Sequence, residues 1–169
     1  MLVYAIWPVI VAGVSVVMDI RDARIDNGWI IFSLGMGFIL QIFRGGIKMA
    51  VPFAAGTVIP LILLGILFYF RMLGPGDIKL FCALGGAMGS RDIVWCIAVS
   101  FFLGAVISVA ILIFCGDIRQ RFQYFFQYFQ EFLHTGERKP YYRKGMALEN
   151  FHFTVPVFLS VVLYAGGVY

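Results

Sequence analysis

Long apolar runs alternate with short polar segments along this chain, and charged residues or glycines end each run. A helix that spans a bilayer needs about 20 apolar residues, so runs near this length predict spanning helices. We expect them at Leu2 to Met18, Trp29 to Phe43, Val51 to Phe70, Ile78 to Met88, Ile93 to Cys115 and Phe151 to Val168. The predicted fold is an all-α membrane protein, a polytopic bundle of about six transmembrane helices.

The fourth run is the shortest, and the polar residues Asp77 and Lys79 lie at its start. Gly85 and Gly89, four residues apart, allow a helix to approach its neighbour closely, as small residues do in membrane packing. We therefore expect the fourth helix to pack inside the bundle.

Composition agrees with a membrane domain: 62% of the 169 residues are hydrophobic, 13% are charged, and the mean hydropathy is +0.93. These values exclude an ordinary soluble domain. Six spans leave little chain for anything else, so residues 1–169 are expected to form a single membrane domain. Within it, residues 116–150 are predicted to form a cytoplasmic or interfacial loop, aromatic in its first half and basic in its second.

The basic residues predict the orientation. If the loop after the first span is cytoplasmic, ten of the thirteen Lys and Arg residues lie on the cytoplasmic side, and only Arg44, Lys48 and Arg91 lie outside. The positive-inside rule then places both chain ends outside and residues 19–28 and 71–79 in the cytoplasm. Because topology accounts for the net charge of +4, no nucleic-acid partner is expected, and the predicted surroundings are the lipid bilayer.

Two acidic residues stand apart from the other seven, which fall in or beside predicted loops. Asp19 ends the first apolar run, and Asp77 opens the fourth after Gly74, Pro75 and Gly76. A solvated helix end explains Asp19, and a first-turn acid favoured by the helix dipole explains Asp77. The glycines need a further reason: they permit positive φ angles and the close approach of a peptide or water to Asp77.

Two facing carboxylates in a partly desolvated cleft share one proton, so that one acts as a base toward water and the other as an acid toward a carbonyl. This is aspartic protease chemistry. The sequence lacks an HExxH motif and a CxxC pair, and His134 and His152 lie near loop ends, where we expect structural roles. We therefore predict no metal and no cofactor, and treat the three cysteines as small core residues, namely Cys82, Cys96 and Cys115.

Two segments resemble the signature motifs of type IV prepilin peptidases, which are GxGD membrane aspartyl proteases. One is the run from Gly74 to Leu80, and the other comprises Asp19, Arg21, Arg24, Ile25 and Asn27. The resemblance implies that Asp19 and Asp77 are catalytic. It also implies that seven neighbours shape the site or contact substrate: Gly74, Pro75, Gly76, Arg21, Ile25, Asn27 and Lys79.

By the same resemblance, the substrate is a prepilin or pseudopilin, and the protein lies in the cytoplasmic membrane of a prokaryote with its active site facing the cytoplasm. Its size is similar to the short form that serves tight-adherence pili. By its resemblance to the short form, we expect it to be without the cysteine-rich domain that is associated with N-methylation in longer members. Asp26 occupies the place of the family's proline and competes with Asp19 for the role of first aspartate, although the spacing to Arg21, Ile25 and Asn27 favours Asp19.

Several simpler interpretations remain beside this one. Lys79 lies two residues from Asp77, on another face of the helix, so we interpret it as an anchor at the membrane edge, and Arg21 and Arg24 equally suit topology determinants. Two acids within a membrane domain also suit a small ion-coupled transporter. A third alternative is a non-enzymatic subunit of a pilus or secretion machine.

Overall fold

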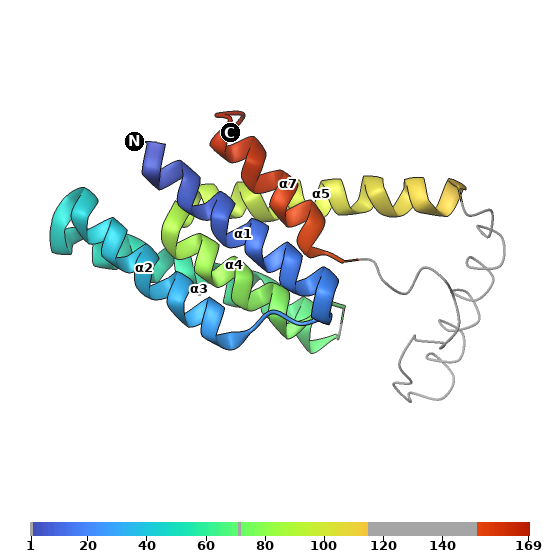
Figure 1. Cartoon of the computed structure of the whole chain (residues 1–169), viewed down its shortest axis with the longest axis horizontal. Coiled ribbons are helices and arrows are strands. Elements are labelled where there is room, and N and C mark those ends of the chain that lie inside the picture. The colour runs from blue at the N-terminus through green and yellow to red at the C-terminus, as the bar shows by residue number, and fades with distance from the viewer. Residues whose placement is uncertain (1, 71, 115–151) are drawn as a thin grey trace. The chain divides into compact units, whose positions relative to one another are not determined.

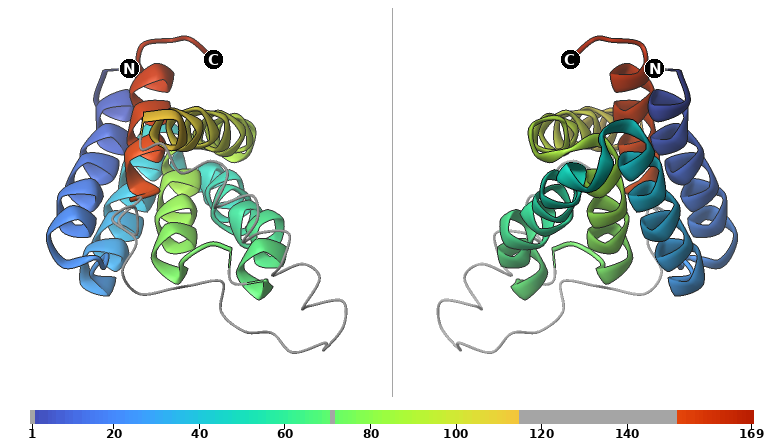
Figure 2. Two further views of the ribbon diagram at one scale, coloured as in Figure 1. Left: turned by 90° about the vertical axis from the view of Figure 1, so that its right-hand side faces the viewer. Right: turned by 90° about the vertical axis from the view of Figure 1, so that its left-hand side faces the viewer.

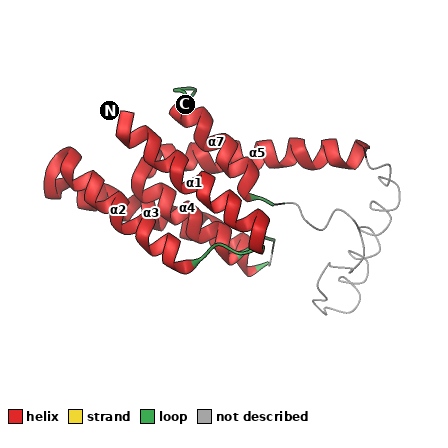
Figure 3. Ribbon diagram, viewed as in Figure 1, coloured by secondary structure: helices red, strands yellow, loops and turns green. Residues whose placement is uncertain are grey.

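The computed structural model describes residues 2–70, 72–114 and 152–169, and in these ranges every regular element is helical (Figure 3). The elements are α1 (Leu2–Asp22), α2 (Asn27–Gly45), the 3₁₀ helix η1 (Gly46–Met49), α3 (Ala50–Tyr69), α4 (Pro75–Met88), α5 (Ser90–Phe114) and α7 (Thr154–Ala165). Each predicted apolar run falls on one α-helix, with ends displaced by a few residues. The all-α class is thus confirmed for the described residues, whereas the loop predicted at 116–150, with His134, lies outside them.

The chain divides into two compact units, Met1–Gly104 with His152–Tyr169, and Ala105–Phe151. All nine predicted site residues belong to the first unit. Within that unit, α1 and α7 run antiparallel, side by side, so that the start of α1 and the C-terminus lie at the same end (Figure 1).

α4 is the central helix of the first unit. It lies between the α1–α7 pair and α3 (Figure 2), and from Ile78 to Met88 only Lys79 and Cys82 are not fully buried. Its side chains Leu80, Phe81 and Leu84 form the core together with residues of α1 and α7. A helix that is apolar around most of its circumference must be enclosed by others, so the prediction that the fourth helix packs inside the bundle is confirmed.

The contact between α3 and α4 depends on glycine. A Cβ atom added to Gly85 would lie 2.1 Å from the backbone oxygen of Gly56, and one added to Gly56 would lie 2.1 Å from the oxygen of Gly85. The two backbones therefore touch directly, which confirms the role expected for Gly85. Gly89 has a different role, because it ends α4 with a φ of 100°, a conformation that favours glycine.

Side-chain hydrogen bonds also join the helices of this unit. Gln41 donates to the backbone oxygen of Ala87 over 2.7 Å, linking α2 to α4, and Ser160 of α7 donates to the oxygen of Cys96 over 3.0 Å. Cys96 is fully buried and Cys82 is partly buried, as expected of small core residues, whereas Cys115 lies outside the described residues. The hydrogen bonds of Gln41 and Ser160 matter because a polar side chain without a partner away from water is costly.

Two helical stretches are long and apolar enough to cross a membrane, Asn27–Tyr69 and Ser90–Ile111, and Thr154–Ala165 is a shorter apolar helix. Only 17% and 28% of the most apolar windows of the two stretches are buried. Large apolar side chains such as Ile31, Phe43 and Ile62 therefore face outward, as they do toward lipid. These features indicate a membrane protein, and the count of six spans stays a prediction.

Candidate active site

Three helix ends meet at one end of the first unit: α1 ends there, and α4 and α7 begin there (Figures 1 and 2). Asp19 lies in the last turn of α1, and Asp77 lies in the first turn of α4. The fold therefore brings to one place two aspartates that are far apart in the sequence.

The N-cap and the first turn of α4 fix the position of Asp77. Gly74 is the N-cap residue in an extended conformation, with φ −72° and ψ 151°, and Pro75 takes the first helical position. Proline suits this position because its fixed φ is helical and its missing N–H needs no partner. Asp77 is then the third helical residue, from which an acidic side chain reaches back to the N-cap. Its carboxylate accepts a hydrogen bond from the backbone N–H of Gly74.

Neither Gly74 nor Gly76 uses the positive φ that glycine permits. Gly74 is extended and Gly76 lies inside α4, and neither is among the glycines with positive φ. Gly74 instead provides space. A Cβ atom on Gly74 would lie 3.1 Å from Oδ2 of Asp77, closer than ordinary packing allows. Close approach, the other role expected of these glycines, therefore accounts for Gly74.

The environment of Asp77 favours its protonated form. Asp77 precedes the apolar run from Ile78, in a helix of 14 residues that is too short to cross a bilayer alone. The pKa of Asp77 is raised from 3.8 to about 6: burial is the largest cause, the negative charge of Asp19 acts in the same direction, and the Gly74 hydrogen bond opposes both. Asp19 thus lies near enough to act on Asp77 through its charge. A raised pKa of this kind is characteristic of a carboxyl group that supplies a proton.

Asp19 has two partners at the start of α7. Oδ2 of Asp19 accepts a hydrogen bond from Oγ1 of Thr154 over 2.8 Å and lies 3.0 Å from Nδ1 of His152. Sequence reasoning assigned His152 a structural role at a loop end and did not consider Thr154. The predicted topology contained the missing signal, because it places the start of the last span on the same membrane side as the end of the first.

The two signature segments also contact each other directly. The side chain of Ile25 packs on Gly76, with its Cδ1 3.7 Å from the position of an added Cβ. Nζ of Lys79 donates a hydrogen bond to Oδ1 of Asn27 over 2.8 Å. Lys79, interpreted from the sequence as an anchor, therefore also joins the second segment to the first.

A family model described as the type IV leader peptidase family matches residues 4–109, more than half of the chain and a range that includes both aspartates. The chain belongs to the type IV leader peptidase family. Membership implies a protease that acts on prepilin-type leaders. No curated protein and no solved structure matches the chain.

Asp26, the second candidate for the first aspartate of a leader peptidase, has a different task here. Asp26 is the N-cap of α2, and its side chain accepts a hydrogen bond from the backbone N–H of Gly28. Aspartate is among the best N-cap residues, so this position explains Asp26 without a catalytic role.

The remaining predicted site residues border the meeting helix ends. Pro75 is exposed in the first turn of α4, and Arg21 is exposed in the last turn of α1. In the described ranges, no three His, Cys, Asp or Glu side chains converge as metal ligands do.

Proposed function

We propose that this member of the leader peptidase family is a membrane aspartic endopeptidase that uses Asp19, Asp77 and a water molecule to remove the leader of a prepilin or pseudopilin. The observation that carries the proposal is the meeting of the two aspartates. They come from helix ends separated in sequence, and the charge of one raises the pKa of the other.

The surroundings of the two carboxyl groups support unequal protonation. Asp77 is partly buried, which favours the protonated form, whereas Asp19 faces two polar side chains. Two carboxyl groups in different environments can divide the acid and base roles between them. A substrate peptide bond would have to lie between Asp77 and the partly exposed side of Asp19.

The proposed reaction needs one proton on the pair. The ionised carboxylate takes a proton from water while the water oxygen attacks the carbonyl carbon, and the protonated carboxyl group gives its proton to the carbonyl oxygen. The tetrahedral diol then collapses. The C–N bond breaks, the nitrogen takes the proton that the base had accepted, and the diol proton returns to the other carboxylate.

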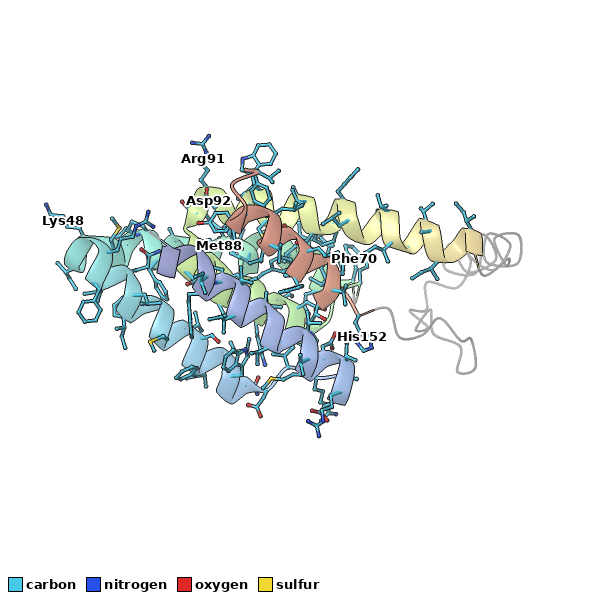
Figure 4. The ribbon with its side chains drawn as sticks, turned by 45° about the horizontal axis from the view of Figure 1, so that its top comes forward. Lys48, Phe70, Met88, Arg91, Asp92 and His152 are labelled. Carbon is cyan, nitrogen blue, oxygen red and sulfur yellow. The ribbon has the colours of Figure 1, made fainter. Side chains whose placement is uncertain are left out.

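The proposed orientation places the meeting helix ends at the cytoplasmic edge of a prokaryotic cell membrane, with the N-terminus outside and six helices crossing the bilayer. Arg21, Arg24 and Lys79 lie in the segments that form this end, whereas Lys48 lies in η1 at the other end of the unit from His152 (Figure 4). Such an imbalance of basic residues is typical of the cytoplasmic side.

The position of the aspartates selects the bond that is cut. A helix deeper in the bilayer would first have to expose backbone groups, at several kcal/mol for each. We therefore expect the cut where a short cytoplasmic leader meets the transmembrane helix of the substrate. By the family resemblance, the leader is basic and ends in glycine, and the uncrowded backbone at Gly74 suits an extended residue without a side chain.

The ion-coupled transporter is less well supported. Transporter sites lie near the bilayer midplane, at broken helices, whereas Asp19 and Asp77 both lie at helix ends. A purely structural subunit offers no reason for a buried acidic group beside a second one, because such a pair costs stability.

The test is to co-express the chain with candidate prepilins and to map the new N-termini by mass spectrometry. We expect one cut, after the leader glycine, on the cytoplasmic side, which persists in the presence of a metal chelator. Cleavage outside the cytoplasm, unchanged cleavage after replacement of that glycine by valine, or loss of activity with chelator would each overturn the proposal.

A further inference from the structure

Two donors at the start of α7 converge on one oxygen of Asp19. Thr154 Oγ1 lies 2.8 Å from Oδ2, and His152 Nδ1 lies 3.0 Å from the same atom. An ionised carboxylate only accepts hydrogen bonds, so the proposed role of Asp19 as the base requires His152 to donate from Nδ1. Both donors therefore hold the same oxygen.

The hydroxyl of Thr154 does not bond to its own helix, in contrast to three other hydroxyls of this unit. Ser15, Thr57 and Ser100 each donate to the backbone oxygen four residues earlier in their own helix. Thr154 is the first residue of α7, where no such oxygen of its own helix exists. Fully buried, it gives its hydrogen to Asp19 instead, and a buried hydroxyl without a partner would be costly.

We propose that His152 and Thr154 are positioning residues: they fix Oδ2 of Asp19 and leave Oδ1 free to take the proton of the attacking water. This inference rests on the proposed function. Both residues lie beyond the stretch matched by the family model, which ends at residue 109. Thr154 is the first residue of α7 and His152 lies two residues before it, so both contacts come from the start of one helix.

The partial exposure of His152 and Asp19 suits this role. The side chains of His152 and Asp19 are 21% and 18% exposed, so water reaches the carboxylate while its orientation is restrained. His152 lies beside the end of α1 (Figure 4). Among the other charged groups near Asp19, Asp77 of α4 is the one on which the charge of Asp19 acts, Lys79 of α4 is bonded to Asn27, and Arg21 and Asp22 of α1 are exposed.

The experiment compares matched pairs of variants of the full chain in detergent. Thr154→Val removes the hydroxyl at nearly constant volume, and Thr154→Ser keeps it. His152→Leu removes the donor, and His152→Asn keeps an N–H at a similar distance from the backbone. The substrate is a prepilin that the wild type cleaves, and kcat, KM and the melting temperature are measured for each variant.

We expect Thr154→Val and His152→Leu to lower kcat about ten- to hundredfold, because a small misplacement of a reacting group has effects of this size, with KM within about twofold. Thr154→Ser and His152→Asn should retain kcat within about threefold of wild type. A merely structural role would instead lower the melting temperature and leave the kcat of the folded fraction unchanged.

Unchanged kcat in both donor-free variants would overturn the proposal, as would equal losses in the donor-keeping variants or an effect confined to KM. If Thr154→Val fails to fold, the comparison of His152→Leu with His152→Asn decides, because His152 is partly exposed. Failure of the proposed function looks different, because the wild type would then not cleave, or Asp19→Asn would cleave normally, and this inference would fall with it.

Discussion

The α3–α4 contact and the end of the unit where Asp19 meets Asp77 use glycine in opposite ways. At the contact, Gly56 and Gly85 bring two backbones together so closely that no Cβ fits. At the aspartates, Gly74 and Gly76 adjoin side chains, namely the Asp77 carboxylate and Ile25. The α3–α4 contact leaves no room for any side chain between the backbones, whereas the glycines at the aspartates leave the Asp77 carboxyl group uncrowded.

The two regions also differ in what they contribute to stability. Dense packing between α3 and α4 gains dispersion energy. A buried acid beside another acid opposes folding once it ionises. The comparison indicates that the packed glycines stabilise the fold, whereas the reactive groups at the polar end destabilise it. Each region can be changed separately.

The largest effect is expected at the packed region. Gly85→Ala places a Cβ against the Gly56 oxygen, so α3 and α4 must separate, at about 1 to 3 kcal/mol or more. The matched control is Gly65→Ala in α3, where an added Cβ meets nothing within 4 Å. Thermal unfolding in detergent should show a marked loss for Gly85→Ala alone, and equal melting temperatures for both variants would contradict the packing assigned to Gly85.

At the end where Asp19 meets Asp77, we expect a substitution to raise the free energy of unfolding instead of lowering it. The pKa of Asp77 is raised from 3.8 to about 6, so ionisation opposes folding: the penalty is absent below about pH 4, grows between pH 4 and 6, and is complete above 6. Asp77→Asn removes it and keeps an acceptor for Gly74. The variant should gain about 2 to 3 kcal/mol at pH 7 and only a small part of that at pH 4.

The control for this stability gain is Asp26→Asn, because asparagine caps helices as well as aspartate does. It should unfold like the wild type at every pH. If Asp77→Asn gains no stability at pH 7, or gains as much at pH 4, Asp77 does not carry the proposed proton.

A smaller effect is expected where Ile25 packs on Gly76. An added Cβ lies at ordinary contact distance from Ile25, 3.7 Å, so Gly76→Ala should cleave nearly as well as wild type. Gly76→Val adds two further methyl groups to that Cβ. They must displace Ile25 and, with it, the segment that contains Asp19. Cleavage should fall about tenfold or more, and near-normal turnover of Gly76→Val would remove Gly76 from the site.

The smallest effect belongs to the exposed hydrogen bond between Lys79 and Asn27. A single such bond contributes about 1 kcal/mol or less, so Asn27→Ala should lower cleavage no more than severalfold. Lys79→Met should have a similar effect, and the double variant should be no worse than either single one. Additive losses in the rates would show that the two residues act independently.

The sequence predicted the helices well because their apolar runs and end signals are local. Asp19 and Asp77 were found because each interrupts such a run at its end. The conformation of Gly74 could not be read from the sequence, since two glycines around a proline suit a positive φ and a helix N-cap equally. The contacts of Asp19 with His152 and Thr154 join residues more than 130 positions apart, and no local pattern encodes them.

The central claim is that Asp19 and Asp77 act as one unit. Its most direct test is the cleavage rate of a prepilin by purified wild type, Asp19→Asn, Asp77→Asn and the double variant, with Asp26→Asn as control. General acid and base groups contribute about 10²- to 10⁴-fold, and members of one unit are not additive. We predict that both single variants and the double variant lose cleavage to the same degree while Asp26→Asn cleaves normally. Normal cleavage by Asp19→Asn with an inactive Asp26→Asn would contradict the account.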